Sequence, residues 1–343
     1  MFAHPLLKYS AELSMEPFGV SVGYRGRSYH IISERPWDVR SLLERCDGRT
    51  SLNILAHASS FTIEEAQRIL TRAEGCHVIL DGDEVLRRDG FMTGRELFWR
   101  LEAALLRWRE QSRPVFGAHG LERGLATGTL PPEVAKGFCL ELCHLLRSVP
   151  EEIGLAVASS TVEAVRTLYV DFFEEEARHG EMITEALAQW LNEADIRKAV
   201  PLPTTTGLMH TYKAMAAKDP LLYAAALIRD EASALDADIP ESEDIYAGLE
   251  GHYDVPAAVV ERYRWHANLD RENEHGFFPE KIFACFPVID AARAEAIGSA
   301  LRQIIDLHEA FRWGVVTYYR EQTVEERIRH PDLIREVSLR HAA

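Results

Sequence analysis

The sequence lacks any apolar run long enough to cross a membrane. A spanning helix needs about 20 consecutive apolar residues, and the longest candidate in the 343 residues runs only from Leu221 to Ile228. The first residues, MFAHPLLKYSAELSMEP, also lack the basic and then apolar pattern of a signal peptide. We therefore expect a cytoplasmic protein with no membrane partner.

The sequence has few cysteines, and its acidic residues outnumber its basic ones. The five cysteines are odd in number and form no CxxC pair, which predicts reduced thiols. Cys139 and Cys143 lie four residues apart on a predicted helix, where two metal ligands could sit, but buried core thiols are the favoured interpretation. The 38 Lys and Arg against 54 Asp and Glu give a formal net charge of -16. This charge argues against a nucleic-acid partner, because affinity for phosphates comes from basic side chains.

The chain is too long for one ordinary core, since single cores stop growing at about 250 to 300 residues. Residues 1–90 mix β-prone segments with short helices. Gly19–Tyr24 and Ser28–Ile32 predict one hairpin, and His77–Leu86, with Asp81-Gly82-Asp83 as its turn, predicts a second. Between them, helices are expected at 36–46, 52–58 and 63–73, the last with a capping box of Thr62 and Glu65. Hairpin, three helices and hairpin predict a small α+β winged-helix domain.

From Gly94 onward the pattern is almost wholly helical. Breaks are expected at residues 112–129, 148–153, 201–207, 236–244 and 278–287. Long helical segments with short connections predict a bundle. We therefore expect a mainly α chain, with a helical domain over 94–320 and a helical tail over 321–343.

One predicted helix carries ionisable residues on its apolar stripe. Over residues 161–191, apolar positions follow three-and-four spacing, and the same spacing passes through Glu176 and His179. Glu175 lies on the flank of the stripe and remains an alternative. A carboxylate and an imidazole at i, i+3 point the same way and can bind one ion together.

Two further helices show the same feature. The stripe of residues 221–235 passes through Glu231, and that of 256–277 passes through His266, Asp270 and Asn273. Each of these alone is explained by a surface residue or a satisfied core pair. Three helices that all bury such groups favour a metal, and carboxylates with a few imidazoles suit iron or manganese. The near absence of thiolates disfavours structural zinc.

The order of these motifs resembles a known family. Phe98 to Leu146, with Trp108, Pro114-Val115-Phe116 and the following Gly128 to Pro131, resembles the opening helices of the TenA-like, haem oxygenase-like fold. Glu-Glu-Glu-Ala-Arg-His at 174–179, the helix that ends at Glu231, and His266-x-x-x-Asp270 resemble the haem oxygenase-like diiron oxidases. The resemblance implies two iron ions that activate dioxygen for hydrogen abstraction, nitrogen oxygenation or C–C cleavage. Its implied ligands are Glu176 or Glu175, His179, Glu231, His266, Asp270 and one further histidine.

The sequence departs from the family at that last ligand. The expected histidine position is occupied by Asn273. His275 is turned by about 140° from Asp270 on a straight α-helix, and a π-bulge could bring it round. Otherwise Asn273 or Glu274 completes the site. The second iron site therefore depends on which of these residues completes it.

The amino-terminal domain resembles another family. Leu43 to Leu52 contains Asp47-Gly48-Arg49-Thr50 and is similar to the helix junction of PqqD-like domains, which bind the leader of a precursor peptide as an added strand. There are two alternatives for this domain. The winged helix could serve only for packing or for a homodimer, or it could bind DNA. The 11 Lys and Arg against 13 Asp and Glu in residues 1–90 give no basic face.

Together the two resemblances predict an iron-dependent oxidase that modifies a ribosomally made peptide, as in natural product biosynthesis. Three alternatives stay open. The same oxidase could act on a free amino acid or fatty acid. A metal-free enzyme, similar to thiaminase or the cofactor-independent quinone-forming oxidase, could use pocket histidines as acid and base. A non-catalytic peptide-binding adaptor is the third. His308 is expected in the core or beside the site.

Overall fold

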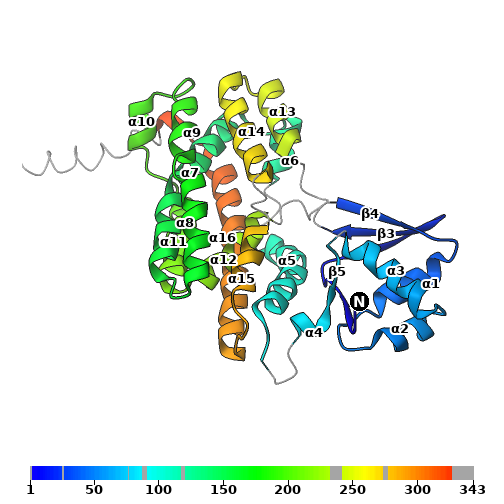
Figure 1. Cartoon of the computed structure of the whole chain (residues 1–343). Helices are drawn as coiled ribbons and strands as arrows, with labels where there is room; N and C mark the ends of the chain where they lie inside the picture. Colours follow the sequence, from blue (N-terminus) through cyan, green and yellow to red (C-terminus); the bar gives the residue numbers. More distant parts are fainter. Residues whose placement is uncertain are drawn as a thin grey trace, which may run out of the picture. The chain divides into compact units, whose positions relative to one another are not determined.

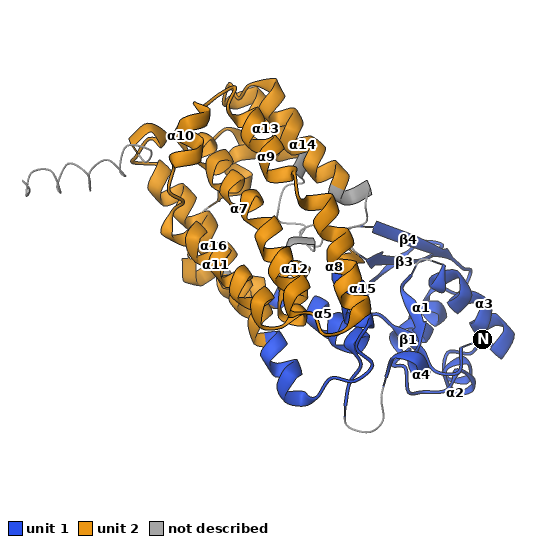
Figure 2. Ribbon diagram, turned by 60° about the vertical axis from the view of Figure 1, so that its left-hand side comes forward, with its two compact units in different colours: residues 1–107, 232–236, 279–298 blue, residues 108–231, 237–278, 299–343 orange. Residues whose placement is uncertain are grey.

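The computed structural model describes residues 2–24, 27–75, 77–86, 91–116, 120–231, 242–272 and 277–326, without the side chains of residues 106, 113, 230–231, 242–243 and 270–272. The chain divides into two compact units (Figure 2). Unit 1 comprises residues 1–107, 232–236 and 279–298, and unit 2 comprises residues 108–231, 237–278 and 299–343. Among the described residues, no helix is long and apolar enough to span a bilayer.

A three-stranded antiparallel sheet opens unit 1. Strands β2 (Glu12–Glu16), β3 (Gly19–Tyr24) and β4 (Arg27–Ile32) pair in the order β2-β3-β4, with Val20 opposite Ile31. The predicted hairpin of residues 19–32 is confirmed. Helices α1 (Pro36–Glu44), α2 (Leu52–Ala58) and α3 (Ile63–Glu74) lie on one side of β3 and β4 (Figure 1). The core between these elements is apolar and includes fully buried leucines 42, 43 and 70.

The helix-start signals of the sequence are confirmed at α3. The Thr62 hydroxyl accepts from the Glu65 amide at 3.2 Å, and the Glu65 carboxylate accepts from the Thr62 amide at 2.8 Å. These hydrogen bonds satisfy two of the amide groups that a helix leaves open at its start. Because they hold the charged form, the hydrogen bonds from Thr62 lower the pKa of Glu65.

The predicted second hairpin is wrong. Strand β5 (Ile79–Asp81) pairs instead with β1 (Pro5–Leu7), with Leu80 opposite Leu6, and Gly82–Val85 forms the short helix α4. The Asp81 carboxylate accepts from the Asp83 amide at 3.0 Å and caps α4. Asp81-Gly82-Asp83 therefore starts a helix rather than a hairpin turn, because a strand from the chain start offers β5 its hydrogen bonds.

The Asp47 side chain organises the turn between α1 and α2. Its carboxylate accepts from the amides of Arg49 at 2.8 Å and Thr50 at 2.7 Å, and from the Thr50 hydroxyl at 3.0 Å. Gly48 adopts φ 73°, a conformation that glycine reaches without strain. Partial burial raises the pKa of Asp47, but these hydrogen bonds outweigh it and hold the pKa below its usual value.

We predict that Asp47→Asn makes folding less dependent on pH. The pKa of Asp47 is lower in the folded chain, so the carboxylate stabilises the fold above its unfolded-state pKa and loses this effect as the pH falls through the folded value. Because Asp47 is exposed, we expect the variant to lose about 0.5 to 1 kcal/mol at neutral pH. Urea unfolding at several pH values measures the difference, which should vanish in acid. A difference that stays constant with pH would contradict this role.

A buried lysine joins the first strands of unit 1 to its helices. Lys8 is 4% exposed, and its Nζ lies 3.1 Å from the Tyr24 hydroxyl and 3.6 Å from Glu280 Oε1. The Trp99 indole donates to the same Glu280 oxygen at 3.2 Å. Ser10 Oγ also donates to Glu102, which is 2% exposed, at 2.5 Å. Buried charges are tolerated when they are paired and hydrogen-bonded, as here.

The remaining elements are helices, and they follow the predicted bundle pattern. They are α5 (Gly94–Phe116), α6 (Leu121–Thr127), α7 (Pro132–Ser159), α8 (Glu163–Glu176), α9 (His179–Leu187), α10 (Glu193–Lys198), α11 (Pro203–Lys218), α12 (Pro220–Glu231), α13 (Ser242–His252), α14 (Ala257–Glu272), α15 (Phe278–Ala284) and α16 (Ala291–Tyr319). In unit 2, α7 packs against α8, α9, α11 and α12 (Figure 2). The helix α7 is therefore a central element of this unit.

Several predicted breaks differ from the structure. The helix α7 continues through Pro150, so the predicted break at 148–153 is wrong. Proline costs about 3 kcal/mol inside a helix, but α7 is buried at Ile153 and Ala156, and this packing outweighs the cost. Part of the predicted break at 278–287 forms α15, and α5 continues through Pro114. Most of the predicted break at 236–244 lies outside the described residues.

Candidate metal centre

Three of the predicted ligands meet inside unit 2. One ligand atom each from Glu176, His179 and His266 lies within 4.8 Å of the others. Glu176 Oε2 is 2.8 Å from His179 Nδ1 and 3.8 Å from His266 Nε2. The side chains of Glu176 and His179 are 6% and 5% exposed, and that of His266 is 14% exposed. A carboxylate and two imidazoles from two stretches of sequence therefore face one another in a mostly buried place.

The donor set fits a transition metal. Ligands at about 2.1 Å from one ion lie about 3 to 4 Å apart, which is close to the spacing of these three atoms. Two histidines and one carboxylate that leave positions open are typical of non-haem ferrous sites. The structure holds these donors with little exposure to water, as a functional metal site requires. Glu176, His179 and His266 would hold the ion.

The local backbone differs from the predicted straight helix over 161–191. The helix α8 ends at Glu176, Ala177 and Arg178 form a turn, and α9 begins at His179. Arg178 has φ -110° and ψ -9°, outside regular α-helical geometry. Despite this break, the Glu176 carboxylate reaches the His179 ring. The two ligands therefore flank a bend between helices, where the sequence predicted one continuous face.

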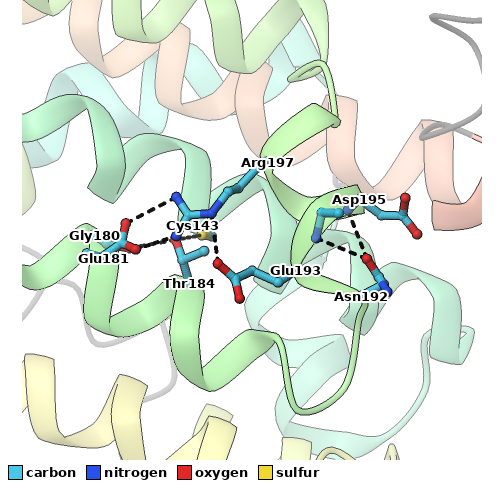
Figure 3. Close-up of polar contacts among 9 residues, drawn as sticks. Cys143, Gly180, Glu181, Thr184, Asn192, Glu193, Asp195 and Arg197 are labelled. Atoms are coloured by element: carbon cyan, nitrogen blue, oxygen red, sulfur yellow. Dashed lines mark hydrogen bonds and ion pairs between the residues drawn. The ribbon is translucent and has the colours of Figure 1, made fainter.

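Gly180 allows α9 to approach α7 closely. A Cβ added at Gly180 would lie 2.6 Å from the Arg147 Cα and 2.8 Å from the Leu146 carbonyl oxygen, so only glycine fits. Thr184 donates to the Gly180 carbonyl at 2.8 Å, and its hydroxyl lies 3.4 Å from Cys143 Sγ (Figure 3). This packing positions His179, the preceding residue. The glycine inside a predicted helix was the sequence signal of a close approach.

An ion pair of Arg197 joins α9 and α10 next to the Gly180 contact. Arg197 of α10 contacts Glu181 of α9 and donates to Glu193 at 2.9 Å (Figure 3). The Asn192 side chain accepts from the Ala194 amide at 3.0 Å and caps α10. The hydrogen bond from Arg197 lowers the pKa of Glu181. This ion pair is exposed and therefore contributes less than the packing at Gly180.

The cysteines of α7 are core thiols. Cys139 and Cys143 are both buried and unlinked. Burial raises the pKa of Cys139 to about 12, so this thiol stays protonated at neutral pH. Neither cysteine belongs to the cluster of possible ligands found among the described residues. The interpretation of these residues as core thiols agrees with the structure.

An aromatic residue that the sequence did not single out packs on the cluster. The ring of Trp265 meets the His179 ring edge to face, at 5.4 Å and 83°. The His179 and His266 rings are 4.9 Å apart at 77°. A cavity of about 260 Å³ on α14 is lined by Glu261, Arg264, Trp265, Asn268 and Leu269. Trp265 therefore lines this cavity and also contacts a ligand imidazole; its only sequence signal was its position beside His266.

The other predicted ligands are placed differently or not described. Glu175 is exposed, so Glu176 is the glutamate of the cluster. Glu231 ends α12 and Asp270 lies on α14 four residues after His266, but both side chains lie outside the described residues. Asn273 and His275 lie outside them entirely. The second iron site, and the choice between His275 and Asn273 as its ligand, therefore stay predictions.

Two further histidines that the sequence analysis considered, both among the described residues, are not part of the cluster. His308 of α16 is 9% exposed, and its Nε2 lies 2.8 Å from the Tyr212 hydroxyl, consistent with the core position expected for it. His210 is exposed on α11.

Comparisons with known proteins identify the architecture of the helical part. No family model and no curated protein matches this chain. A domain of unknown function with a haem oxygenase-like fold from Shewanella denitrificans matches with 12% identity and a TM-score of 0.54, over 64% of this chain and 92% of that one. A TenA homologue from Pseudomonas syringae matches with 12% identity and a TM-score of 0.49, over 64% and 93%. A TenA homologue from P. horikoshii matches with 18% identity and a TM-score of 0.42, over 64% and 98%.

The first of these matches supports the fold alone, because a sequence identity of 12% carries no information on activity. In this chain, the helices α5 to α16 follow the small sheets. The predicted fold class is confirmed: small antiparallel sheets and short helices at the amino terminus are followed by a helical domain with the haem oxygenase-like fold.

Proposed function

We propose that the helical domain is a dioxygen-activating oxidase that holds non-haem iron with Glu176, His179 and His266. The observation that carries this proposal is the mostly buried cluster of one carboxylate and two imidazoles. Carboxylate and imidazole ligands with open positions suit ferrous iron, and manganese fits the same donors. When bound, the ion would supply the electrons that dioxygen needs to react. Enzymes are known among proteins of this fold, so an oxidase is compatible with the architecture.

The residues around the cluster would bind the ion, orient a substrate beside it and shield the ligands from water. Glu176 accepts a hydrogen bond from His179 or shares an ion with it, depending on which imidazole nitrogen carries the proton. The Trp265 ring covers one side of the His179 ring and keeps water from it. The cavity beside Trp265 offers a place for the reacting part of a substrate.

A second iron belongs to the proposal. Its ligands would be Glu231, Asp270 and either His275 or Asn273. Support comes from the helix α14, where Asp270 follows His266 by four residues and so lies on the same face. An ion held there would share the dioxygen chemistry with the first.

We further propose that residues 1–90 recognise a precursor peptide through its leader. Support comes from the Asp47 to Thr50 junction and from the free side of the three-stranded sheet. Among the described strands, β4 pairs only with β3, while α3 packs beside it. An extended peptide can add to such an edge as a further strand and place side chains against the helix.

A metal-free enzyme is the second candidate. The observation that favours it is the hydrogen bond of 2.8 Å between Glu176 and His179, which is a carboxylate–imidazole pair suited to general base catalysis. In that case activity would survive a chelator.

Oxygen-electrode measurements on the full chain test the proposal. After anaerobic ferrous loading, we expect dioxygen consumption to accelerate when a precursor peptide encoded beside this protein's gene is added, and to stop with chelator. No consumption with peptides, free amino acids or fatty acids would overturn the oxidase. Acceleration by an amino acid or fatty acid, with none by peptides, would overturn peptide recognition. Product formation that persists with chelator would favour the metal-free enzyme.

A further inference from the structure

A line of aromatic rings runs through the core of unit 2. Phe172 stacks on Phe278, with ring centroids 4.3 Å apart, and Phe278 meets Tyr169 edge to face at 5.4 Å. Tyr169 lies 5.9 Å from Tyr223, which lies 6.1 Å from Tyr212. All five side chains are buried. Rings at such distances are in van der Waals contact, so an electron can pass between neighbouring tyrosines.

One end of this line lies beside the metal cluster. Phe172 and Tyr169 precede Glu176 on α8 by one and two turns. Seven residues make about two turns, about 10 Å along the axis, so Tyr169 and Glu176 project from the same face of the helix. This spacing is short enough for electron transfer through protein.

At the other end of this line of rings, Tyr212 contacts a base, the imidazole of His308. The Tyr212 hydroxyl and His308 Nε2 are 2.8 Å apart, and both side chains are buried. When His308 is neutral with its proton on Nδ1, Nε2 accepts a hydrogen bond from Tyr212. A phenol that loses an electron becomes strongly acidic, and a neutral imidazole can take the released proton.

The tyrosine nearest the cluster has a different partner. The Tyr169 hydroxyl donates to the Pro220 carbonyl oxygen at 2.7 Å. A carbonyl oxygen accepts a hydrogen bond but does not take a proton at neutral pH. An oxidised Tyr169 therefore has a carbonyl oxygen rather than a base beside its acidic proton and is quickly reduced by its neighbours, whereas an oxidised Tyr212 passes its proton to His308 and becomes a long-lived neutral radical.

From this difference we infer that Tyr212 and His308 are a redox-active pair that supplies one electron to the metal cluster through Tyr223 and Tyr169. The inference rests on the proposed function for its oxidant, which is a one-electron oxidant formed from dioxygen at the cluster. The oxidant gains one electron, Tyr212 loses one, and the phenolic proton moves to His308 Nε2. A soluble reductant such as ascorbate then returns the electron, and His308 returns the proton. The pair would discharge the oxidant when no substrate is bound and so protect the ligands.

The test uses the metal-free full chain, so it does not depend on iron binding. Flash-generated ruthenium(III) tris-bipyridine supplies the oxidant, and time-resolved absorption with high-field electron paramagnetic resonance follows the radical. We expect a long-lived neutral tyrosyl radical in the wild type. In Tyr212→Phe and His308→Gln its decay should be faster by about tenfold or more. Glutamine keeps a hydrogen-bond acceptor but cannot take the proton.

A matched control is available in the same unit. Tyr253 is 6% exposed, and its hydroxyl donates to the Gly124 carbonyl at 2.8 Å, so it resembles Tyr212 in burial but has no base. We expect Tyr253→Phe to keep the wild-type radical. Equal radical lifetimes in the wild type, Tyr212→Phe and His308→Gln would overturn the inference, as would an equal loss in Tyr253→Phe.

A measurement on the wild type alone covers the case in which a variant fails to fold. With ¹⁵N-labelled histidine, the radical should show coupling to an imidazole nitrogen and to one exchangeable proton. A tyrosyl radical without that coupling would overturn the inference. Failure of iron to bind, together with a radical coupled to histidine, would overturn the proposed oxidase but leave the redox pair intact.

Discussion

Replacing Glu176 by alanine is expected to weaken ferrous iron binding by about 100-fold or more, while replacing the adjacent Glu175 leaves it unchanged. Removal of groups that only support a metal ligand costs about 10- to 100-fold in affinity, and Glu176 is one of three donors in the cluster. Its loss also removes the negative charge that offsets the cation. Glu175 is exposed and outside the cluster, although it immediately precedes Glu176 in the sequence.

Anaerobic titration with ferrous iron, followed by metal analysis of the washed protein, measures this difference. His266→Ala should behave as Glu176→Ala does, because it removes another of the three donors, the one on α14. Circular dichroism of each variant establishes that the bundle is folded. Wild-type protein that binds no iron, or a Glu175→Ala variant that loses iron as Glu176→Ala does, would contradict the assignment.

Replacing Glu141 by alanine is expected to lower the free energy of unfolding by about 3 to 5 kcal/mol. Glu141 of α7 is completely buried. Its two carboxylate oxygens accept from the Leu202 amide at 3.0 Å and from the Tyr319 hydroxyl at 2.9 Å. Alanine would leave both donors buried without this acceptor and would open a cavity. The carboxylate therefore ties α7 to the start of α11 and to the end of α16.

Guanidinium unfolding followed by circular dichroism measures the effect. Glu151→Ala on the same helix is the matched control, since its side chain is 66% exposed and pairs with Lys213 at the surface. Exposed pairs of this kind contribute about 0 to 1 kcal/mol. Glu141→Gln should lie between the two, because its amide can accept from one donor only. A Glu141→Ala variant as stable as Glu151→Ala would refute this account of α7.

Local patterns in the sequence were sufficient for many elements. The hairpin of β3 and β4 and the capping box of Thr62 and Glu65 are confirmed because each depends on residues close together in the chain. The same reasoning placed Glu176, His179 and His266 on apolar faces, since only buried positions follow that spacing. The structure brings these three residues together.

Contacts between distant segments account for the incorrect predictions. The strand β5 pairs with β1 from the start of the chain, so no local turn signal could predict it. The helix α7 continues through Pro150, and it is buried before and after the proline at Ser148 and Ile153, where distant segments pack on it. The bend after Glu176 lies close to Gly180, where α9 packs against α7. The spacing of apolar residues along one helix cannot predict that contact.

The sequence by itself therefore indicated many of the buried side chains, where most helices begin, and which residue types bear chemistry. These properties depend on residues within a few turns of one another. Only the tertiary structure decided that Glu176 rather than Glu175 joins the two histidines, that Trp265 covers one of them, and that a line of tyrosines ends at His308. Those outcomes depend on how helices far apart in sequence pack, because a shift of one residue on a helix turns a side chain by about 100°.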